Sequence, residues 1–395
     1  MRKLISLILC LLMICLMLTG CSESFIEKFR EDIHQYDDVV LDSDREELEL
    51  DFYIICGEGT TDRSKEDVER YINAHLSDLY KTTLDIHYLS ADEYEEIALA
   101  DAKATGESRA DIVLIAGKDM FDKFFNEILL ANISYLYETK KYGLLNTIVS
   151  STLLKSSIVE VQAVDKFGVS FADRRYYTVP NNHVIGEYDY ILINKEMATD
   201  YLNYSPRQLS EMTTYELTAE LRAKIGADAD NYVKQVSGTY MDKAKYEAQG
   251  YHVNIASYPV ADVEEAFSSA FSIVRHELDT RHLQAEEDIS INAKNAYENH
   301  YDRCMEVVYA LSSDPVLRNL LQYGHKGTNY VVDDNDNIVP FGSDDAGYYN
   351  MNLLYTGNVF TAYYCKDGWS KDDYLNGLEQ NKQSVVPVVV APPAE

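Results

Sequence analysis

The stretch that decides the fold is Leu50-Asp51-Phe52-Tyr53-Ile54-Ile55-Cys56, a short apolar run that ends in the turn Gly57-Glu58-Gly59. Runs of this length before a glycine-rich turn are typical of buried strands. A second such run follows at residues 111–117, and residues 83–89 between them alternate as a strand does. The pattern therefore predicts three strands within the first seventy residues of the folded part.

The segments between these strands have helical periodicity. Ser64 is the expected N-cap of the first helix, with Asp67 three residues on. The side chains that recur along one helical face are Val68, Tyr71, Ile72, His75, Leu76, Leu79 and Tyr80. A second helix is expected around residues 91–104. Strand and helix alternation predicts an α/β layer with parallel pairing and right-handed crossovers.

The rest of the chain predicts a second lobe and a hinge. Further expected elements are an amphipathic helix over 120–129, an extended segment at 176–182, strands at 188–194 and 253–258, a helix from Ser205-Pro206, a long helix over 297–311 and a strand-like tail at 385–390. We expect two lobes that share strands across the hinge. Residues 48–186 with 262–315 are assigned to lobe 1, and residues 187–261 with 316–395 to lobe 2.

The first twenty-one residues have the order of a secretory signal. Arg2 and Lys3 precede an uncharged apolar run from Leu4 to Leu18, which leads through Thr19-Gly20 into Cys21. This end resembles the lipobox of bacterial lipoproteins, which implies cleavage before Cys21 and diacylglycerol on its thiol. The alternative is a membrane-spanning anchor, but the run falls short of the roughly twenty residues that spanning needs. Residues 1–20 are thus expected to be a signal peptide and 21–47 an anchor and acidic tether, outside the cytoplasmic membrane.

Charge and cysteine content exclude several classes. Without residues 1–20 the chain has 33 basic against 66 acidic residues, so binding to nucleic acid is not expected. Beyond Cys21, only Cys56, Cys304 and Cys365 remain, which predicts neither a disulfide framework nor a zinc site. No other metal site or cofactor is expected.

Several weak motifs in order resemble one family. They are the strand and polar turn at 50–61, the strand at 111–116, Tyr177-Thr178-Val179-Pro180 before the strand 190–196, Leu320–Gly324 with Asn329-Tyr330, Thr356-Gly357-Asn358 and Glu379-Gln380-Asn381. The chain resembles extracellular solute-binding proteins of ABC importers, the carbohydrate-binding type, and a clostridial subgroup. The resemblance implies a two-lobed periplasmic-binding-protein-like fold of type II, with central mixed sheets flanked by helices. It also implies a monomer that captures a sugar by hinge closure for a permease, without catalysis.

Ligands of open α/β sheets bind beyond the carboxyl ends of the strands. Sugars offer faces for aromatic stacking and hydroxyls for polar groups. The ligand-binding residues expected on these grounds are Glu58, Thr60, Gly117, Tyr177, Asn181, Tyr330, Asp344 and Trp369. Structural roles remain open alternatives: capping for Thr60 and Asn181, and core packing for Tyr177 and Tyr330.

The sequence also bears on other ligands and functions. The family usually displays several tryptophans in its cleft, whereas this chain has only Trp369, so a peptide or other polar solute stays open as ligand. A glycan-acting surface enzyme and a sensory or adhesive lipoprotein are the alternative functions. Residues 333–337 resemble the opening of an EF-hand, but Ile338 stands where glycine is required, so a solvated turn is expected.

Overall fold

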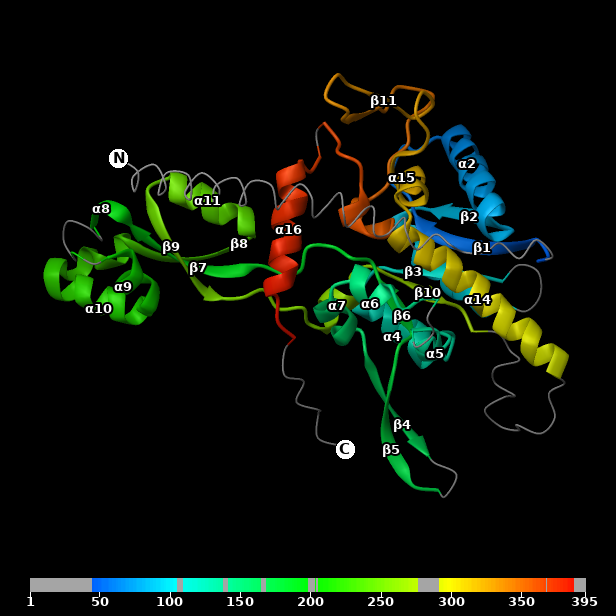
Figure 1. Cartoon of the computed structure of the whole chain (residues 1–395), viewed down its shortest axis with the longest axis horizontal. Helices are drawn as coiled ribbons and strands as arrows, with labels where there is room; N and C mark the ends of the chain where they lie inside the picture. The colour runs from blue at the N-terminus through cyan, green and yellow to red at the C-terminus, as the bar shows by residue number, and fades with distance from the viewer. Residues whose placement is uncertain are drawn as a thin grey trace, which may run out of the picture.

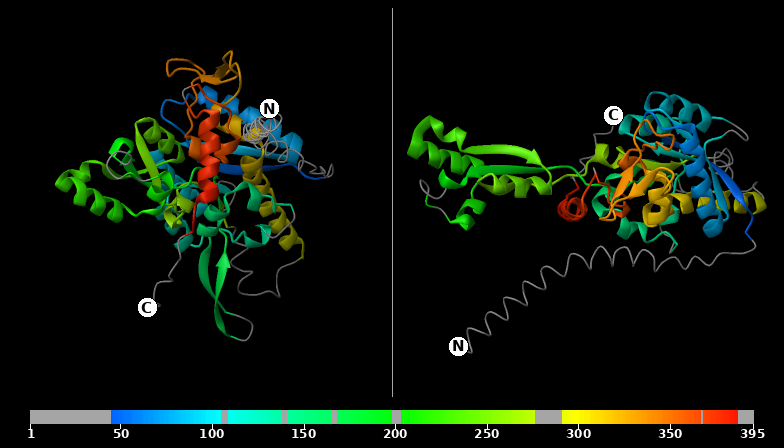
Figure 2. Two further views of the ribbon diagram at one scale, coloured as in Figure 1. Left: turned by 60° about the vertical axis from the view of Figure 1, so that its left-hand side comes forward. Right: turned by 90° about the horizontal axis from the view of Figure 1, so that it is seen from above.

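The computed structural model describes residues 45–104, 109–137, 141–164, 168–197, 203, 205–275, 291–366 and 368–386. The chain forms a larger and a smaller lobe joined by a neck (Figure 1). Helix α16 (Lys371–Gln383) stands at this neck, and the smaller lobe extends away from it (Figure 2). Cys21, the signal peptide and most of the acidic tether lie outside the described residues. No helix in the described part of the chain is both long and apolar enough to cross a membrane.

A five-stranded mixed sheet forms the centre of the larger lobe. Its strand order is β2-β1-β3-β10-β6, in which β1 pairs parallel with β2 and β3, and β10 runs antiparallel to β3 and β6. The strands are β1 (Leu48–Ile55), β2 (Thr82–Leu89), β3 (Ile112–Ile115), β10 (Ala270–Ile273) and β6 (Thr178–Pro180). The three predicted parallel strands are therefore confirmed. The sequence did not predict that β10, more than 150 residues after β3, lies antiparallel between β3 and β6.

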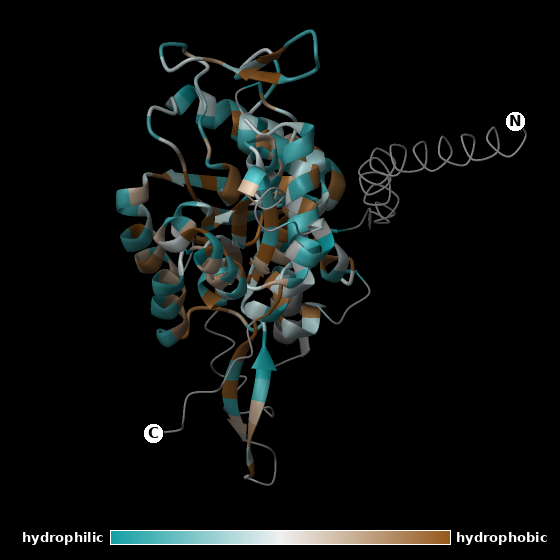
Figure 3. Ribbon diagram, turned by 90° about the vertical axis from the view of Figure 1, so that its left-hand side faces the viewer, coloured by the Kyte–Doolittle hydropathy of each residue, from teal (hydrophilic) through white to brown (hydrophobic). Residues whose placement is uncertain are grey.

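Helices flank this sheet, and the segments coloured as hydrophobic concentrate in the interior of the larger lobe (Figure 3). The helices of the larger lobe are α2 (Asp62–Tyr80), α3 (Ala91–Ala102), α4 (Lys118–Asn126), α5 (Ser134–Tyr137), α6 (Leu145–Ile148), α7 (Ser151–Ser156), α12 (Val263–Phe267), α14 (Ile291–Ser313) and α15 (Pro315–Tyr323). The buried face of α2 includes Val68, Ile72 and Leu76, as the periodicity predicted.

Two helix boundaries differ from the prediction. The N-cap of α2 is Thr61, whose hydroxyl accepts a hydrogen bond from the Ser64 N–H, while Ser64 itself is buried inside the first turn. Helix α4 ends at Asn126 rather than at residue 129. Ile128 follows with φ 58° and an exposed side chain, so it does not continue the apolar face of the helix.

The smaller lobe is built on a three-stranded antiparallel sheet of order β8-β7-β9. It consists of β7 (Tyr188–Asn194), α8 (Lys195–Met197), α9 (Pro206–Glu211), α10 (Thr214–Ile225), the 3-10 helix η2 (Gly226–Asn231), β8 (Val233–Gly238), α11 (Tyr240–Ala248) and β9 (Tyr251–Ser257). Alternate side chains of the central strand β7 enter two separate cores, with Ile191 and Ile193 on one face and Tyr188 and Tyr190 on the other. The strand is therefore covered on both faces.

Two chain segments cross between the lobes. Residues 181–187, here called the hinge segment, lead from β6 to β7, and residues 258–262 lead from β9 back to α12. The segment just after α16 joins the second crossing, because the Val385 N–H donates to the Pro259 carbonyl and the Val385 carbonyl accepts the Ala261 N–H. The predicted two-lobed α/β architecture with a hinge is thus confirmed.

The C-terminal region packs differently from the predicted division of the lobes. Leu317, Leu321, Tyr349 and Met351 belong to the same core as the five-stranded sheet. Helix α15 follows α14 directly, and the carboxylate of Asp314 caps it by accepting the N–H groups of Val316 and Leu317. Residues up to about 355 therefore pack with the larger lobe, whereas the sequence assigned 316–395 to lobe 2.

Smaller elements complete the chain. They are the projecting hairpin β4 (Val159–Val164) and β5 (Ser170–Arg175), the hairpin β11 (Tyr330–Val332) and β12 (Ile338–Pro340), and the 3-10 helices η3 (Leu353–Tyr355) and η4 (Val359–Thr361). Residues 333–337 form the turn between β11 and β12, as expected, where Asp333 Oδ1 accepts the N–H groups of Asn335 and Asn337. Of the strand-like tail, Val385 is described and pairs with Val260, and residues 387–395 lie outside the described part.

Candidate functional site

The carboxyl edge of the five-stranded sheet gathers four of the predicted ligand-binding residues. Strands β1, β2, β3 and β6 all end there, because β10 is antiparallel to both of its neighbours. Glu58 and Thr60 follow β1, Gly117 follows β3, and Asn181 follows β6. The rule that ligands bind beyond the carboxyl ends of strands therefore selects one continuous edge of the larger lobe.

A pocket of about 690 Å³ opens at this edge, within the usual range for small-molecule sites. We call it the edge pocket. It is lined by Ile55, Cys56, Gly57, Glu58, Gly59, Thr60, Lys65, Tyr88, Ser90, Ala91, Asp92, Glu93, Asn350, Asn352 and Tyr355. The lining combines carboxylates, amides and hydroxyls with two tyrosine rings. Such a set can offer hydrogen bonds and a ring face to a polar, hydroxylated ligand.

Glu58 lies exposed on the rim of the edge pocket, and Thr60 supports its wall. The Thr60 hydroxyl lies 3.0 Å from the Gly57 carbonyl oxygen and accepts the Asn350 N–H at 3.1 Å. The Gly57 N–H in turn donates to the Asn350 carbonyl at 2.8 Å. A Cβ at Gly57 would come within 2.4 Å of the Asn350 side chain, so glycine permits this close approach. Thr60 thus joins the β1 turn to a loop almost three hundred residues away.

Cys56 is a half-buried thiol in the lining of the edge pocket. Burial raises the pKa of Cys56 above that of an ordinary cysteine. The thiol is therefore protonated at neutral pH, which is the unreactive form of the side chain.

Asn181 and Gly117 lie at the same edge with most of their polar groups already paired. Asn181 is buried, and its Nδ2 donates to the Ser269 hydroxyl at 2.8 Å and to the Leu354 carbonyl at 3.1 Å. Its Oδ1 is buried and has no hydrogen-bond partner among the described residues. Gly117 has φ 135° and donates its N–H to the Phe267 carbonyl. Asn181 Oδ1 is thus a buried acceptor without a partner among the described residues at this end of the sheet.

Three other predicted residues lie away from the edge pocket lining. Tyr177 is packed in the core, edge-on to Phe125 with ring centroids 5.1 Å apart. Tyr330 is buried in β11, and Asp344 is exposed in the turn that follows β12. For Tyr177 and Tyr330 the packing matches the structural alternative considered from the sequence.

Trp369 lines a second, smaller pocket at the neck, of about 200 Å³. We call it the hinge pocket. It is lined by Val184, Thr239, Tyr240, Trp369, Asp373, Asn376, Gly377 and Gln380. Thr239 and Tyr240 belong to the smaller lobe and Val184 to the hinge segment, so the pocket changes shape if the lobes move. Trp369 is half-buried and packs against Tyr374, with ring centroids 5.3 Å apart.

Side chains of α16 bind the hinge segment directly. Asn381 donates from Nδ2 to the His183 carbonyl at 2.6 Å and accepts the Ile185 N–H at 2.8 Å. Gln380 donates to the Ile185 carbonyl at 2.7 Å and accepts the Tyr240 N–H of the smaller lobe at 2.9 Å. The Gln380-Asn381 pair therefore links the helix, the hinge segment and the smaller lobe.

Of the fifteen residues that line the edge pocket, only Glu58 and Thr60 were predicted from the sequence. Residues 90–93 follow β2, and Tyr88 lies next to its carboxyl end, so the rule applied to the ends of β1 and β3 would also have selected them. Asn350, Asn352 and Tyr355 had no such signal, because a loop is placed at the sheet edge only by tertiary packing. The carboxylates of the edge pocket do not form a metal-ligand group; in the described part of the chain, one such group was found, on β1 and β2.

Comparison with solved structures supports the architecture. An N-glycan transport solute binding protein (NgtS) from Streptococcus pneumoniae superposes with a TM-score of 0.50 at 13% identity, covering 86% of this chain and 84% of that chain. Its complex with Man5GlcNAc gives 0.48 at the same identity, over 86% and 83%. The ABC substrate-binding protein Lmo0181 from Listeria monocytogenes in complex with cycloalternan has a TM-score of 0.33 at 9% identity, covering 87% of this chain and 89% of that chain.

Only the first of these similarities is close enough to bear on the fold. No protein-family model and no curated protein matches the sequence. The described chain therefore has the predicted two-lobed α/β fold of the periplasmic-binding-protein type, with a mixed sheet flanked by helices.

Proposed function

We propose that this chain is an extracytoplasmic solute-binding protein that captures a sugar or oligosaccharide between its lobes and delivers it to an ABC permease. Diacylglycerol on Cys21 would hold the protein at the membrane. The anchor would raise its local concentration at the permease, so that transfer becomes an encounter between neighbours. The chain would act as a monomer and without catalysis.

The observation that carries this proposal is the position of the edge pocket. It opens at the carboxyl ends of β1 and β2, in a lobe that two crossing segments join to a smaller lobe. Closure about such a hinge can bury a ligand that one lobe alone leaves exposed. The two crossings, 181–187 and 258–262, are short enough to act as the hinge.

The chemistry of the edge pocket favours a carbohydrate. Glu58, Asp92, Asn350 and Asn352 can pair with sugar hydroxyls, while the Tyr88 and Tyr355 rings offer apolar surface. The structural similarity points the same way, since the protein at TM-score 0.50 is described as an N-glycan transport solute binding protein. The protonated Cys56 thiol gives this pocket no ready nucleophile.

A thermal-shift screen of residues 22–395 tests the proposal. Monosaccharides, oligosaccharides that contain mannose and N-acetylglucosamine, and short peptides would be compared. A ligand at 100 times its dissociation constant should stabilise the protein by about 2.7 kcal/mol. Trp369, the only indole of the chain, should change its fluorescence if the hinge pocket closes.

Variants locate the binding site within the same screen. Glu58→Gln on the pocket rim should weaken the shift, whereas Glu160→Gln on the projecting hairpin should leave it unchanged. A shift with peptides alone would replace the carbohydrate assignment. Turnover of a glycan by the purified chain would contradict binding without catalysis, and unchanged sugar uptake after gene deletion would contradict delivery to an importer.

A further inference from the structure

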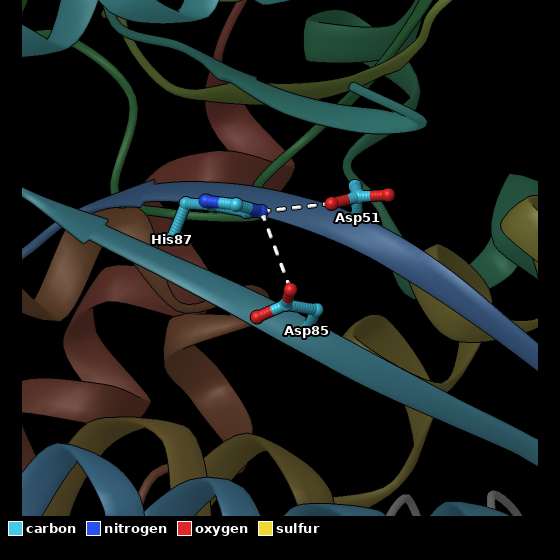
Figure 4. Close-up of side chains that lie close together, drawn as sticks. All are labelled: Asp51, Asp85 and His87. Carbon is cyan, nitrogen blue, oxygen red and sulfur yellow. Dashed lines mark hydrogen bonds and ion pairs between the residues drawn. The ribbon is translucent and has the colours of Figure 1, made fainter. Parts of the chain in front are cut away.

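We propose that β1 and β2 carry a binding site for a divalent transition-metal ion, formed by Asp51, Asp85 and His87 (Figure 4). None of these side chains lines the edge pocket, and the site is separate from the proposed capture of a solute.

The register of two parallel strands brings the three ligands onto one face of the sheet. Asp51 lies opposite Asp85, and Tyr53 lies opposite His87. Because side chains alternate along a strand, residues two apart share a face. Asp85 and His87 therefore point to the same side as Asp51, and Tyr88 points to the other side, where it lines the edge pocket.

The ligand atoms have the spacing of a metal site. His87 Nε2 lies 2.8 Å from Asp51 Oδ1 and 3.9 Å from Asp85 Oδ2, and the three atoms lie within 4.8 Å of one another. Around a tetrahedral ion with bonds of about 2.1 Å, ligand atoms are about 3.4 Å apart. The two measured separations lie on either side of that value. The side chain of Asp85 is 59% exposed, so water can reach the fourth position.

The imidazole is held in the orientation that a ligand needs. The Tyr53 ring stacks on the His87 ring with centroids 4.1 Å apart and planes 11° from parallel. The Tyr53 hydroxyl donates to Asp101 at 2.9 Å, which fixes the tyrosine in turn. Contacts that fix the orientation of a metal-binding side chain raise the affinity of the site for the metal.

The group has more negative charge than one imidazole can balance. The charged neighbours that act on Asp51 are His87, Asp111 and Asp85. A divalent cation would supply the missing charge at the point where the two carboxylates and the imidazole meet.

One imidazole with two carboxylates favours zinc or a neighbouring transition metal over calcium or magnesium, which prefer oxygen ligands alone. A bound ion would join β1 to β2 at their middle. The carboxyl ends of these same strands form the edge pocket, so the ion would stiffen the frame from which the pocket is built.

Calorimetric titration of the metal-free chain (residues 22–395) with Zn²⁺ tests the site. One ion per chain should bind, and the dissociation constant should rise at least tenfold in His87→Gln and in Asp85→Asn. His75→Gln is the matched control, because His75 pairs with Asp314 elsewhere in the lobe and belongs to no three-ligand group of the described residues. Circular dichroism should show that the exposed Asp85→Asn variant is folded.

Crystals soaked in Zn²⁺ give an independent readout. Anomalous scattering at the zinc edge should place the ion between His87 Nε2 and the two carboxylates. Absence of stoichiometric binding to the wild-type chain would overturn the site. Equal affinity of the wild-type, His87→Gln and Asp85→Asn chains would also overturn it, because the ion would then be held elsewhere.

Discussion

Replacement of Asn381 by alanine should loosen the hinge segment. Asn381 is 7% exposed, and its amide satisfies two backbone groups of the hinge segment: the His183 carbonyl and the Ile185 N–H. Ile185 is fully buried and His183 almost so, at 0% and 4% exposure. Water therefore has little access to either group, and alanine leaves both without a partner.

The size of the effect follows from these two groups. A buried backbone donor or acceptor that loses its partner costs about 1–3 kcal/mol. Two of them give an expected loss of about 2–6 kcal/mol in the free energy of unfolding. The loss is a large part of the total for a protein of ordinary stability, which lies at about 5–15 kcal/mol.

Urea denaturation followed by Trp369 fluorescence measures this loss near its origin, because Trp369 packs on α16 through Tyr374. The midpoint should fall while the slope with urea stays unchanged. The matched control is Lys382→Ala, the next residue of the same helix, whose exposed side chain pairs with Glu379 at 3.5 Å. An exposed ion pair contributes at most about 1 kcal/mol.

The difference in stability between the two variants shows whether the Asn381 amide supports the hinge segment. If Asn381→Ala destabilises the chain no more than Lys382→Ala does, the amide does not support the hinge and the reasoning is refuted. A change of slope without a change of midpoint would instead show that the variant alters the surface exposed on unfolding or breaks two-state behaviour.

Three further predictions address the hinge pocket, the edge pocket and a surface turn. Gly377→Ala should lower the free energy of unfolding measured in urea by about 1–3 kcal/mol, because its Cβ would meet Val184 Cγ2 at 2.5 Å. Gly342→Ala is the control and should be neutral, because its Cβ would meet only Asp345 Oδ2, at the ordinary contact distance of 3.6 Å. Burial raises the pKa of Cys56, so the rate of its alkylation, measured by mass spectrometry, should increase only at a pH above the range in which ordinary thiols ionise. A ligand bound in the edge pocket should slow this alkylation, and equal rates with and without ligand would place the ligand elsewhere. Backbone hydrogen bonds from Asn337 and Asn335 lower the pKa of Asp333, so the β11–β12 turn should be most stable above about pH 4 and weaken as the pH falls through the lowered pKa; an NMR titration that returns an ordinary carboxyl pKa would contradict this.

Much of the larger lobe was predictable because its first elements form from local patterns. The apolar run around Phe52, the helical face with Val68 and Leu76, and the run from Ile112 to Ile115 each bury side chains at a period set by the element itself. The boundaries were less predictable. Thr61 and Ser64 are both residue types that cap helices well, and the sequence does not show that Ser64 is buried in the first turn, which leaves Thr61 as the N-cap of α2.

The candidate site was predicted only in part, for a physical reason. Glu58, Thr60, Gly117 and Asn181 follow strands directly, so the direction of the strands places them at one edge. Trp369 was expected to contact the ligand, whereas in the structure it lines the hinge pocket. Tyr240, which lines the same pocket, belongs to the smaller lobe, so only the packing of the lobes brings the two together. Polar residues such as Asn350 have no periodic signature, and their place depends on how distant segments pack.

The sequence by itself determined the alternation of strand and helix, which neighbouring residues encode, and the excess of acidic over basic residues. The export signal that ends at Cys21 stays a prediction from the sequence. Tertiary structure alone decided that β10 enters between β3 and β6, that residues up to about 355 pack with the larger lobe, and that Asn381 supports a hinge segment almost two hundred residues before it. These choices depend on contacts between segments far apart in the chain. Such contacts are selected by the burial and pairing of the whole fold, which no local pattern records.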